Sequence, residues 1–127
     1  MKIDGCYAMS VTGPLGESPS IAIVIPALNE KENLDLLLPA LKEMVVGMGI
    51  TAEIVVVDGG SLDGTRDAAE KRGARVILQT EPGYGGALRA GFAATAAPYI
   101  VTMDADLSHR PVFLEEFWRR RDEAEVL

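Results

Sequence analysis

The stretch Tyr99-Ile-Val-Thr-Met-Asp-Ala-Asp-Leu-Ser-His109 joins a short apolar run to two carboxylates that lie one residue apart. Residues 99–103 follow Pro98 and are mostly apolar or β-prone, which predicts a buried strand rather than a helix. Asp104 and Asp106 come directly after this strand, where carboxylates are costly to desolvate unless a cation meets them. Residues two apart in an extended chain point to the same side, so both carboxylates could bind one hard divalent ion, Mg²⁺ or Mn²⁺. The alternative is structural, with Asp104 stabilising a turn and Asp106 capping the segment that follows.

The composition of the 127 residues narrows the class of protein. The hydrophobic share of 48% is enough for one packed domain, and the net charge of −7 argues against nucleic acid as a partner. The single cysteine, Cys6, excludes an intramolecular disulfide and a cysteine-rich metal site. No apolar stretch reaches the ~18 residues that a transmembrane helix needs, and no signal-peptide hydrophobic region is present. We therefore expect a cytoplasmic protein, and the sequence leaves open a peripheral position at the cytoplasmic face of the membrane.

Apolar runs alternate with helical patterns along most of the chain. Strands are expected at 21–25, 53–57, 75–78 and 99–103, and helices at 31–48, from the glycine-rich turn 58–65 to about 72, at 87–96 and from Pro111 onward. Pro39 should kink or split the first helix. This alternation predicts an α/β fold, a Rossmann-like and mainly parallel sheet with helices on both faces. Residues 1–20 are interpreted as an irregular lead-in and residues 21–127 as the domain.

Polar and acidic residues follow three of the four expected strands. Ligands of parallel sheets bind beyond the carboxyl ends of the strands, beside the point where the strand order reverses, so these residues predict one common site. They are Asn29 and Glu30 after the first strand, Asp58, Ser61 and Asp63 after the second, and Asp104 and Asp106 after the fourth. Asn29 and Asp63 also suit the N-caps of the helices that follow them, and for Asp63 we favour that structural role.

Three segments, in this order, resemble a known family. They are Ile-Val-Ile-Pro-Ala-Leu-Asn-Glu (23–30), Val-Val-Asp-Gly-Gly-Ser-Leu-Asp-Gly-Thr (56–65) and Met-Asp-Ala-Asp-Leu-Ser-His (103–109). Together they resemble the donor half of a family 2 glycosyltransferase with the GT-A fold, over residues 21–127. The third segment, with the glycine-rich residues 83–91, is most similar to the dolichyl- or polyprenyl-phosphate mannosyltransferase branch.

The resemblance implies a site for a GDP- or UDP-linked sugar across the ends of the first, second and fourth strands. Asp104, Ala105 and Asp106 would hold the diphosphate, and the two aspartates would bind Mn²⁺ or Mg²⁺ and act as the catalytic residues. The nucleoside would be lined by Pro26, Ala27, Leu28, Glu30, Val57, Asp58 and Gly59. The implied acceptor is a polyprenyl or dolichyl phosphate. Because such a phosphate arrives ionised, no strong base is needed and His109 need not be catalytic.

This chain departs from the family pattern in three respects. Gly59 stands where relatives commonly have a second acid that helps to recognise the base, so the choice between GDP and UDP is left open. Leu28 stands where relatives often have an aromatic residue. Relatives also need further strands after the metal motif to build the acceptor side. We therefore expect a domain truncated on its C-terminal side, inactive alone and prone to self-association.

Other interpretations are open at this point. The chain could be a non-catalytic nucleotide-binding module, or a half-domain that pairs with a partner through an open sheet edge. Phosphotransferases of the haloacid dehalogenase kind also use Asp-x-Asp, but they place it after the first strand of their fold. Gly83–Gly86 at a helix start could bind an anion or could allow close packing.

Overall fold

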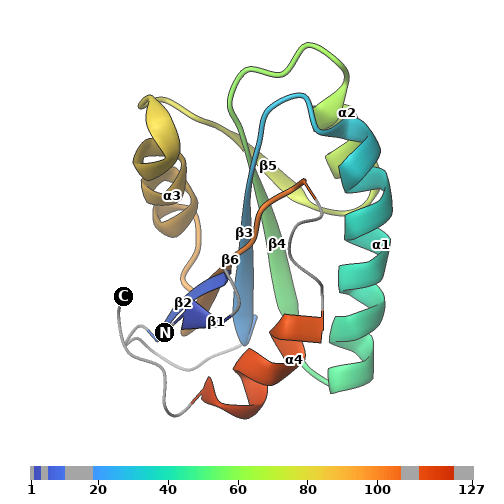
Figure 1. Cartoon of the computed structure of the whole chain (residues 1–127), viewed down its shortest axis with the longest axis vertical. Coiled ribbons are helices and arrows are strands. Elements are labelled where there is room, and N and C mark those ends of the chain that lie inside the picture. The colour runs from blue at the N-terminus through green and yellow to red at the C-terminus, as the bar shows by residue number, and fades with distance from the viewer. Residues whose placement is uncertain (1, 4–5, 11–18, 107–111, 122–127) are drawn as a thin grey trace.

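The computed structural model describes residues 2–3, 6–10, 19–106 and 112–121, which form one six-stranded sheet with helices on both faces (Figure 1). The strands are β1 (Lys2–Ile3), β2 (Cys6–Ser10), β3 (Ile21–Ala27), β4 (Ala52–Asp58), β5 (Arg75–Leu78) and β6 (Tyr99–Thr102). The helices are α1 (Lys31–Met48), α2 (Thr65–Lys71), α3 (Gly83–Ala93) and α4 (Val112–Arg119). The predicted α/β class and mainly parallel sheet are confirmed.

The order of the strands across the sheet is β1-β2-β6-β3-β4-β5. Strands β3 to β6 run parallel, whereas β2 is antiparallel to β6 and β1 is antiparallel to β2. The chain moves outward from β3 through β4 to β5 and then returns to the other side of β3 to form β6. The strand order therefore reverses between β3 and β6, and a crevice for a ligand is expected at their carboxyl ends.

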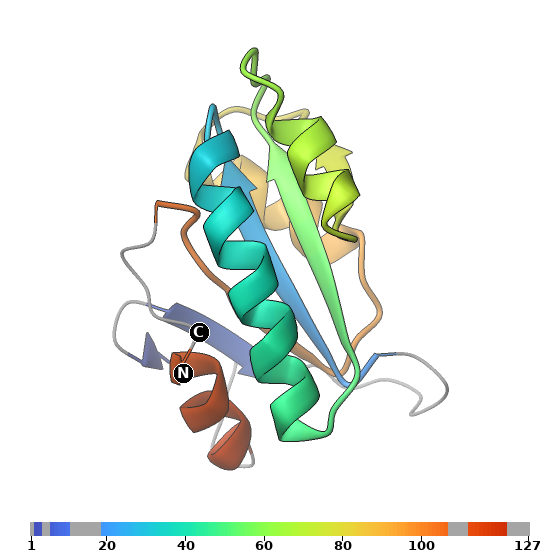
Figure 2. The same ribbon diagram turned by 90° about the vertical axis from the view of Figure 1, so that its right-hand side faces the viewer.

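The central strand β3 supplies side chains to two separate cores. Ile21, Ile23 and Ile25 pack on one face with α1, α2 and α4, and Ala22 and Val24 pack on the other with α3 (Figures 1 and 2). All five side chains are fully buried. This burial on both faces explains why the strand is a continuous apolar run instead of an alternating one.

Helix α1 has the bounds that its sequence predicts, and Pro39 does not split it. Its buried residues recur at three- and four-residue steps on both sides of the proline and hold the helix against the sheet. They are Leu34, Leu37, Leu38, Leu41 and Val45. The helix ends at Gly49, whose left-handed φ of 68° suits glycine.

The interpretation of residues 1–20 as an irregular lead-in is wrong for residues 2–3 and 6–10. Strand β2 pairs with β6, with Tyr7 opposite Thr102 and Ser10 opposite Tyr99. The sequence of residues 6–10 does not predict this strand, because five residues are too few to show a clear periodicity. The strand is stabilised by pairing with β6, some ninety residues further along the chain.

Strand β3 also extends two residues beyond its predicted end and includes Pro26 and Ala27. The carbonyl of Val24 accepts a hydrogen bond from Met103 N, so alternate residues of β3 face β6. The last residue of β3 paired with β6 is Val24, and Pro26 lies beyond it. The absent N–H of Pro26 therefore costs the sheet no hydrogen bond on that side.

Helix α4 packs its apolar side on the sheet, as its spacing predicts. Leu114 and Phe117 are buried, and the Tyr99 ring meets those of Phe117 and Trp118 edge-on, with centroids 6.1 Å and 5.7 Å apart. Within the described ranges, no helix has both the length and the apolar character that crossing a membrane would require.

Candidate functional site

A pocket of about 580 Å³ lies beyond the carboxyl ends of the parallel strands, at the upper end of the sheet in Figure 1. It includes the point between β3 and β6 where the strand order reverses. The lining comes from the ends of all four parallel strands and from the first turns of α3. It consists of Pro26, Ala27, Leu28, Glu30, Gly59, Gln79, Pro82, Gly83, Tyr84, Ala87, Asp104, Ala105 and Asp106.

A second hollow, of about 550 Å³, lies at the opposite end of the sheet, between α1 and the starts of β4 and β5. Its charged lining residues include Glu53 and Arg75, which form an ion pair at 3.1 Å. Arg75 also donates to the carbonyl of Ala94, and Thr95 donates to Glu53. These groups hold β4, β5 and the end of α3 together, so we place the candidate site in the pocket at the carboxyl ends.

Eight of the ten residues predicted for the site line this pocket. They are Pro26, Ala27, Leu28, Glu30, Gly59, Asp104, Ala105 and Asp106. The other two, Val57 and Asp58, are not among the residues that line it. Val57 is fully buried in the core beneath α3, and the Asp58 side chain has no exposed surface.

The Asp58 carboxylate is turned into the loop that follows β4. Its two oxygens accept from Ser61 N at 3.1 Å and 3.3 Å, and Oδ2 lies 3.5 Å from Arg66 Nε. A buried carboxylate needs such partners, because burying it without a hydrogen bond or a cation is costly. Asp58 therefore stabilises the loop from beneath and does not face the pocket.

Asn29 joins the loops after β3 and β4. Its backbone N–H donates to Ser61 Oγ at 2.8 Å, and its Oδ1 accepts from Leu62 N at 2.8 Å. Its φ of 53° is left-handed, a conformation that asparagine adopts more readily than most residues. The prediction that Asn29 caps α1 is wrong, because Glu30 holds the N-cap position.

Asp63 binds the first turns of two helices at once. Its carboxylate accepts from Lys31 N at 3.2 Å and from Thr65 N at 3.0 Å, the first residues of α1 and α2. It also accepts from the Thr65 hydroxyl, and this bond is the main reason why the pKa of Asp63 lies below its ordinary value. The predicted structural role is supported, although the N-cap residue of α2 is Gly64. With Glu30 N donating to Thr65 Oγ1 at 3.0 Å, the two loops form one rigid wall.

Asp104 and Asp106 line the pocket after β6, the strand next to β3. Met103 N anchors this segment to Val24 O at 3.0 Å, and the buried Ala105 separates a half-buried Asp104 from an exposed Asp106. A turn begins at Ala105, so the two carboxylates are not on one side of an extended strand, as predicted from the sequence. Both nevertheless line the same pocket.

The two carboxylates fit a divalent ion of the Mg²⁺ or Mn²⁺ kind. Carboxylate oxygens are hard ligands, and such ions usually bind one or two protein carboxylates and take their other ligands from substrate phosphates and water. In the part of the chain that the structure describes, no cluster of three or more acidic, histidine or cysteine side chains is placed to hold a metal. The donor set therefore suits an ion shared with a phosphate-bearing ligand.

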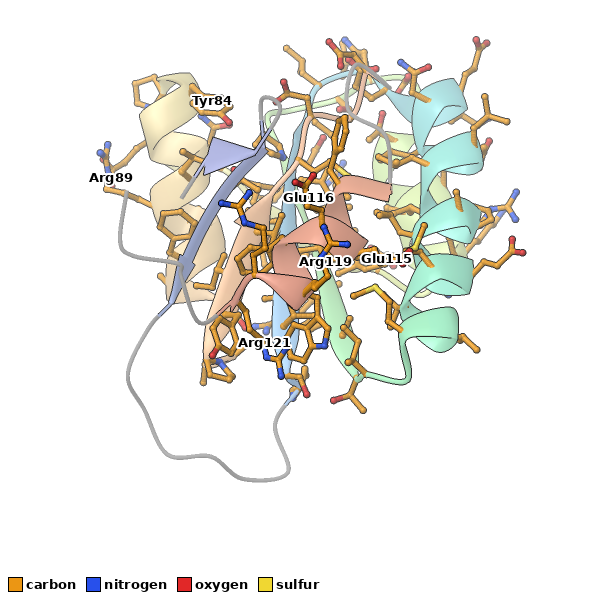
Figure 3. All side chains as sticks on the ribbon, turned by 60° about the horizontal axis from the view of Figure 1, so that its bottom comes forward. Tyr84, Arg89, Glu115, Glu116, Arg119 and Arg121 are labelled. Carbon is orange, nitrogen blue, oxygen red and sulfur yellow. The ribbon has the colours of Figure 1, made fainter. Side chains whose placement is uncertain are left out.

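The sequence did not predict the part of the wall between β5 and α3. Gln79 Nε2 donates to the carbonyls of Glu81 and Gly83, and Arg89 pairs with the Glu81 carboxylate at 2.8 Å. A Cβ on Gly86 would lie 2.2 Å from the Glu81 carbonyl oxygen, so close packing explains this glycine. Tyr84 lies at the start of α3, and Arg89 points away from the sheet (Figure 3). Only the position of Gln79 could have predicted its place in the site. It directly follows β5, which ends at the same edge of the sheet as the other parallel strands.

The model of the family described as "Glycosyl transferase family 2" matches residues 22–126, the whole of the parallel sheet and its helices. The chain belongs to this family. An uncharacterised glycosyltransferase of Mycobacterium tuberculosis is 38% identical over 87 residues, which cover 68% of this chain and 37% of that protein. Glucosyl-3-phosphoglycerate synthase of the same organism is 34% identical over 104 residues, which cover 75% and 32%. This family 2 glycosyltransferase domain therefore spans about a third of the length of the curated relatives that it matches.

Solved structures agree with this assignment. The crystal structure of M. tuberculosis glucosyl-3-phosphoglycerate synthase superposes with a TM-score of 0.72 at 31% identity, over 84% of this chain and 42% of that chain. A complex of that enzyme with Mn²⁺, uridine diphosphate and phosphoglyceric acid gives 0.71 at 30% identity, over 84% and 40%.

Proposed function

We propose that this domain binds a UDP-linked sugar together with Mn²⁺ and forms the donor side of a glycosyltransferase. The observation that supports this best is that Asp104 and Asp106, after β6, line one pocket with the ends of β3 and β4, and the strand order reverses between β3 and β6. The synthase crystallised with Mn²⁺ and uridine diphosphate supports the choice of manganese and of the uridine nucleotide.

The chemistry of the leaving group explains why carboxylates lie at this edge. Negative charge develops on the diphosphate as the bond to the sugar breaks, and a bound divalent ion neutralises it as a Lewis acid. Asp104 and Asp106 would hold that ion and so orient the diphosphate. Ala105 is buried between them and keeps the segment fixed.

Glu30 is placed to bind the nucleoside. Its carboxylate accepts from Asn33 Nδ2 at 2.7 Å, which fixes its orientation at the start of α1. It lines the same pocket as Leu28 and Gly59. A fixed carboxylate here can accept hydrogen bonds from ribose hydroxyls, while Leu28 contributes an apolar surface.

For the acceptor we propose a molecule that carries a phosphate. The sequence resemblance favours a polyprenyl phosphate, whereas the relative with a named activity makes glucosyl-3-phosphoglycerate. The two basic residues that directly follow α4 contact other side chains of this chain, which gives a lipid phosphate little support. Arg120 lies 3.6 Å from Glu116, and Arg121 covers the Trp118 ring at 4.2 Å. The choice between these acceptors is therefore left to experiment.

Titration calorimetry with UDP in the presence and absence of Mn²⁺ tests the donor site. We expect Mn²⁺ to strengthen binding, and Asp104→Asn or Asp106→Asn to remove most of that gain, because each lowers the charge that holds the ion. Asp67→Asn is the matched control, since Asp67 is an exposed acid on α2 away from this pocket. Full Mn²⁺ enhancement in both pocket variants would show that the metal site is assigned to the wrong residues.

Transfer of labelled sugar from UDP-glucose identifies the acceptor. The reaction is offered 3-phosphoglycerate and a short-chain polyprenyl phosphate in parallel. Label in only one product decides between them. Nucleotide binding with no label in either would indicate a different acceptor, a non-catalytic module, or a chain that is inactive alone, as predicted from the sequence.

A further inference from the structure

The side-chain amide of Gln79 is held in one orientation. The same terminal atom lies 2.6 Å from the Glu81 carbonyl oxygen and 2.9 Å from that of Gly83. Two acceptors can be satisfied together only by an NH₂ group, so this atom is the nitrogen and the other is the oxygen Oε1. The loop that supplies the two carbonyls is itself fixed by the ion pair of Glu81 with Arg89 and by the packing of Gly86.

Oε1 lies beside Gly59, on the pocket wall. A Cβ built on Gly59 would be 3.5 Å from Oε1, 3.6 Å from Ala27 O and 3.8 Å from Leu28 Cβ. The strand ends that carry these residues are neighbours, and Gln79 N donates to Asp58 O at 2.9 Å. The absence of a side chain at residue 59 leaves room for a flat group to lie against the wall and reach Oε1.

This place is the far end of the pocket from the paired carboxylates. From β6 to β5 the sheet crosses three strand spacings, roughly 14 Å at about 4.8 Å each. If Asp104 and Asp106 hold the diphosphate, an extended nucleotide that passes Leu28 and Glu30 brings its base to Gly59 and Gln79.

We infer that Gln79 selects uracil over cytosine, by accepting a hydrogen bond from a ring N–H through Oε1. The inference rests on the proposed function. Uracil presents such a donor at N3, whereas cytosine has an unprotonated N3, which would face the lone pairs of Oε1. Because the amide is already fixed by its other end, little conformational freedom is lost on binding.

The test must separate recognition of the base by Oε1 from stabilisation of the loop by Nε2, because the same side chain does both. Gln79→Lys keeps donors for the two carbonyls but has no acceptor, whereas Gln79→Leu removes both. Thr80→Ala is the control, an exposed neighbour that does not line the pocket. Binding of UDP, N3-methyl-UDP and CDP to the full chain is measured by calorimetry with Mn²⁺.

The parent and Thr80→Ala should bind UDP about tenfold more tightly than N3-methyl-UDP or CDP. These two ligands lose the hydrogen bond from N3 and leave Oε1 without a partner, which costs about this factor in affinity. In Gln79→Lys the UDP to N3-methyl-UDP ratio should approach one, and CDP should bind at least as well as UDP. A Gln79→Lys protein that keeps the parental ratios would overturn the inference and leave the proposed function standing. Failure of the parent to bind UDP with Mn²⁺ would overturn both.

Discussion

The two walls of the pocket are built in different ways. The first wall, residues 27–31 with 58–65, is held by hydrogen bonds between side chains and backbone that link the β3 and β4 loops. Most of the rest of the lining, which we call the second wall, is in two parts at opposite ends of the pocket, residues 79–84 after β5 and residues 104–106 after β6, and it carries the amide and the carboxylates that can meet a ligand. Most polar residues of the first wall bind other parts of the protein, whereas the second wall includes the carboxylates of Asp104 and Asp106 and the amide of Gln79, which line the pocket. Substitutions in the two walls should therefore have separable effects on stability and on nucleotide binding.

Gly86→Ala should have the largest effect, because it disturbs the second wall through the backbone. The new Cβ would meet the Glu81 carbonyl oxygen at 2.2 Å, and neither group can move without shifting the helix or the loop. We expect a loss of about 1–3 kcal/mol in the free energy of unfolding, as for other overpacked sites. The discrimination between UDP and CDP should weaken at the same time, because Gln79 is bonded to this loop.

The neighbouring residue supplies the control. Gly85 lies in the same helix, and a Cβ there would meet only Arg89 Nη1, at an ordinary 3.6 Å. Gly85→Ala should raise the free energy of unfolding by about 0.5–1 kcal/mol, through the higher helix propensity of alanine. Equal destabilisation by the two variants would indicate that the close contact at Gly86 is not what limits this position.

Asp58→Ala should affect stability and leave binding intact, which sharpens the contrast between the walls. It leaves Ser61 N and the Arg66 guanidinium without their buried partner. The free energy of unfolding, measured by chemical denaturation, should fall by about 1–3 kcal/mol. Because the carboxylate does not reach the pocket, the Kd of the folded protein for UDP with Mn²⁺ should change by no more than about twofold. A large loss of affinity, measured where the variant is fully folded, would place Asp58 on the ligand after all.

The difference between the walls also explains what the sequence could predict. The leucine spacing of α1 and Gly49 predict its bounds, because an amphipathic helix is a local pattern. Asp104 and Asp106 could be predicted as site residues because they are acids that directly follow a strand, and the strand order brings them to the pocket. The direction of the Asp58 side chain depends on Ser61 and Arg66, so residue type alone does not predict that its carboxylate is buried in the loop. Gln79 has neither charge nor motif, and only its position at the end of β5 marks it.

Substitutions of Asn29 separate backbone strain from hydrogen bonding in the first wall. Asn29→Gly loses the bond to Leu62 N but removes the Cβ from the left-handed residue, whereas Asn29→Ala loses the same bond and keeps a Cβ in a conformation that alanine adopts less readily than asparagine. We expect losses of about 1 kcal/mol and about 2 kcal/mol respectively in the free energy of unfolding. Circular dichroism during urea denaturation measures both. If glycine were as destabilising as alanine, the left-handed backbone would carry no cost of its own.

The smallest effect concerns the pH dependence of the first wall. The pKa of Asp63 lies below its ordinary 3.8, chiefly because its carboxylate accepts from the Thr65 hydroxyl, with further bonds from Lys31 N and Thr65 N. A group whose pKa is lower in the folded state stabilises the fold above its unfolded pKa and loses that contribution as the pH falls through the folded pKa. The difference in unfolding free energy between the parent and Asp63→Asn should therefore be constant from pH 7 to about 5 and shrink below about pH 4. Denaturation at a series of pH values measures it, and comparison with the variant removes the titration of the other carboxylates. A difference that grew as the pH fell would mean that the protonated acid, rather than the carboxylate, holds the starts of α1 and α2 together.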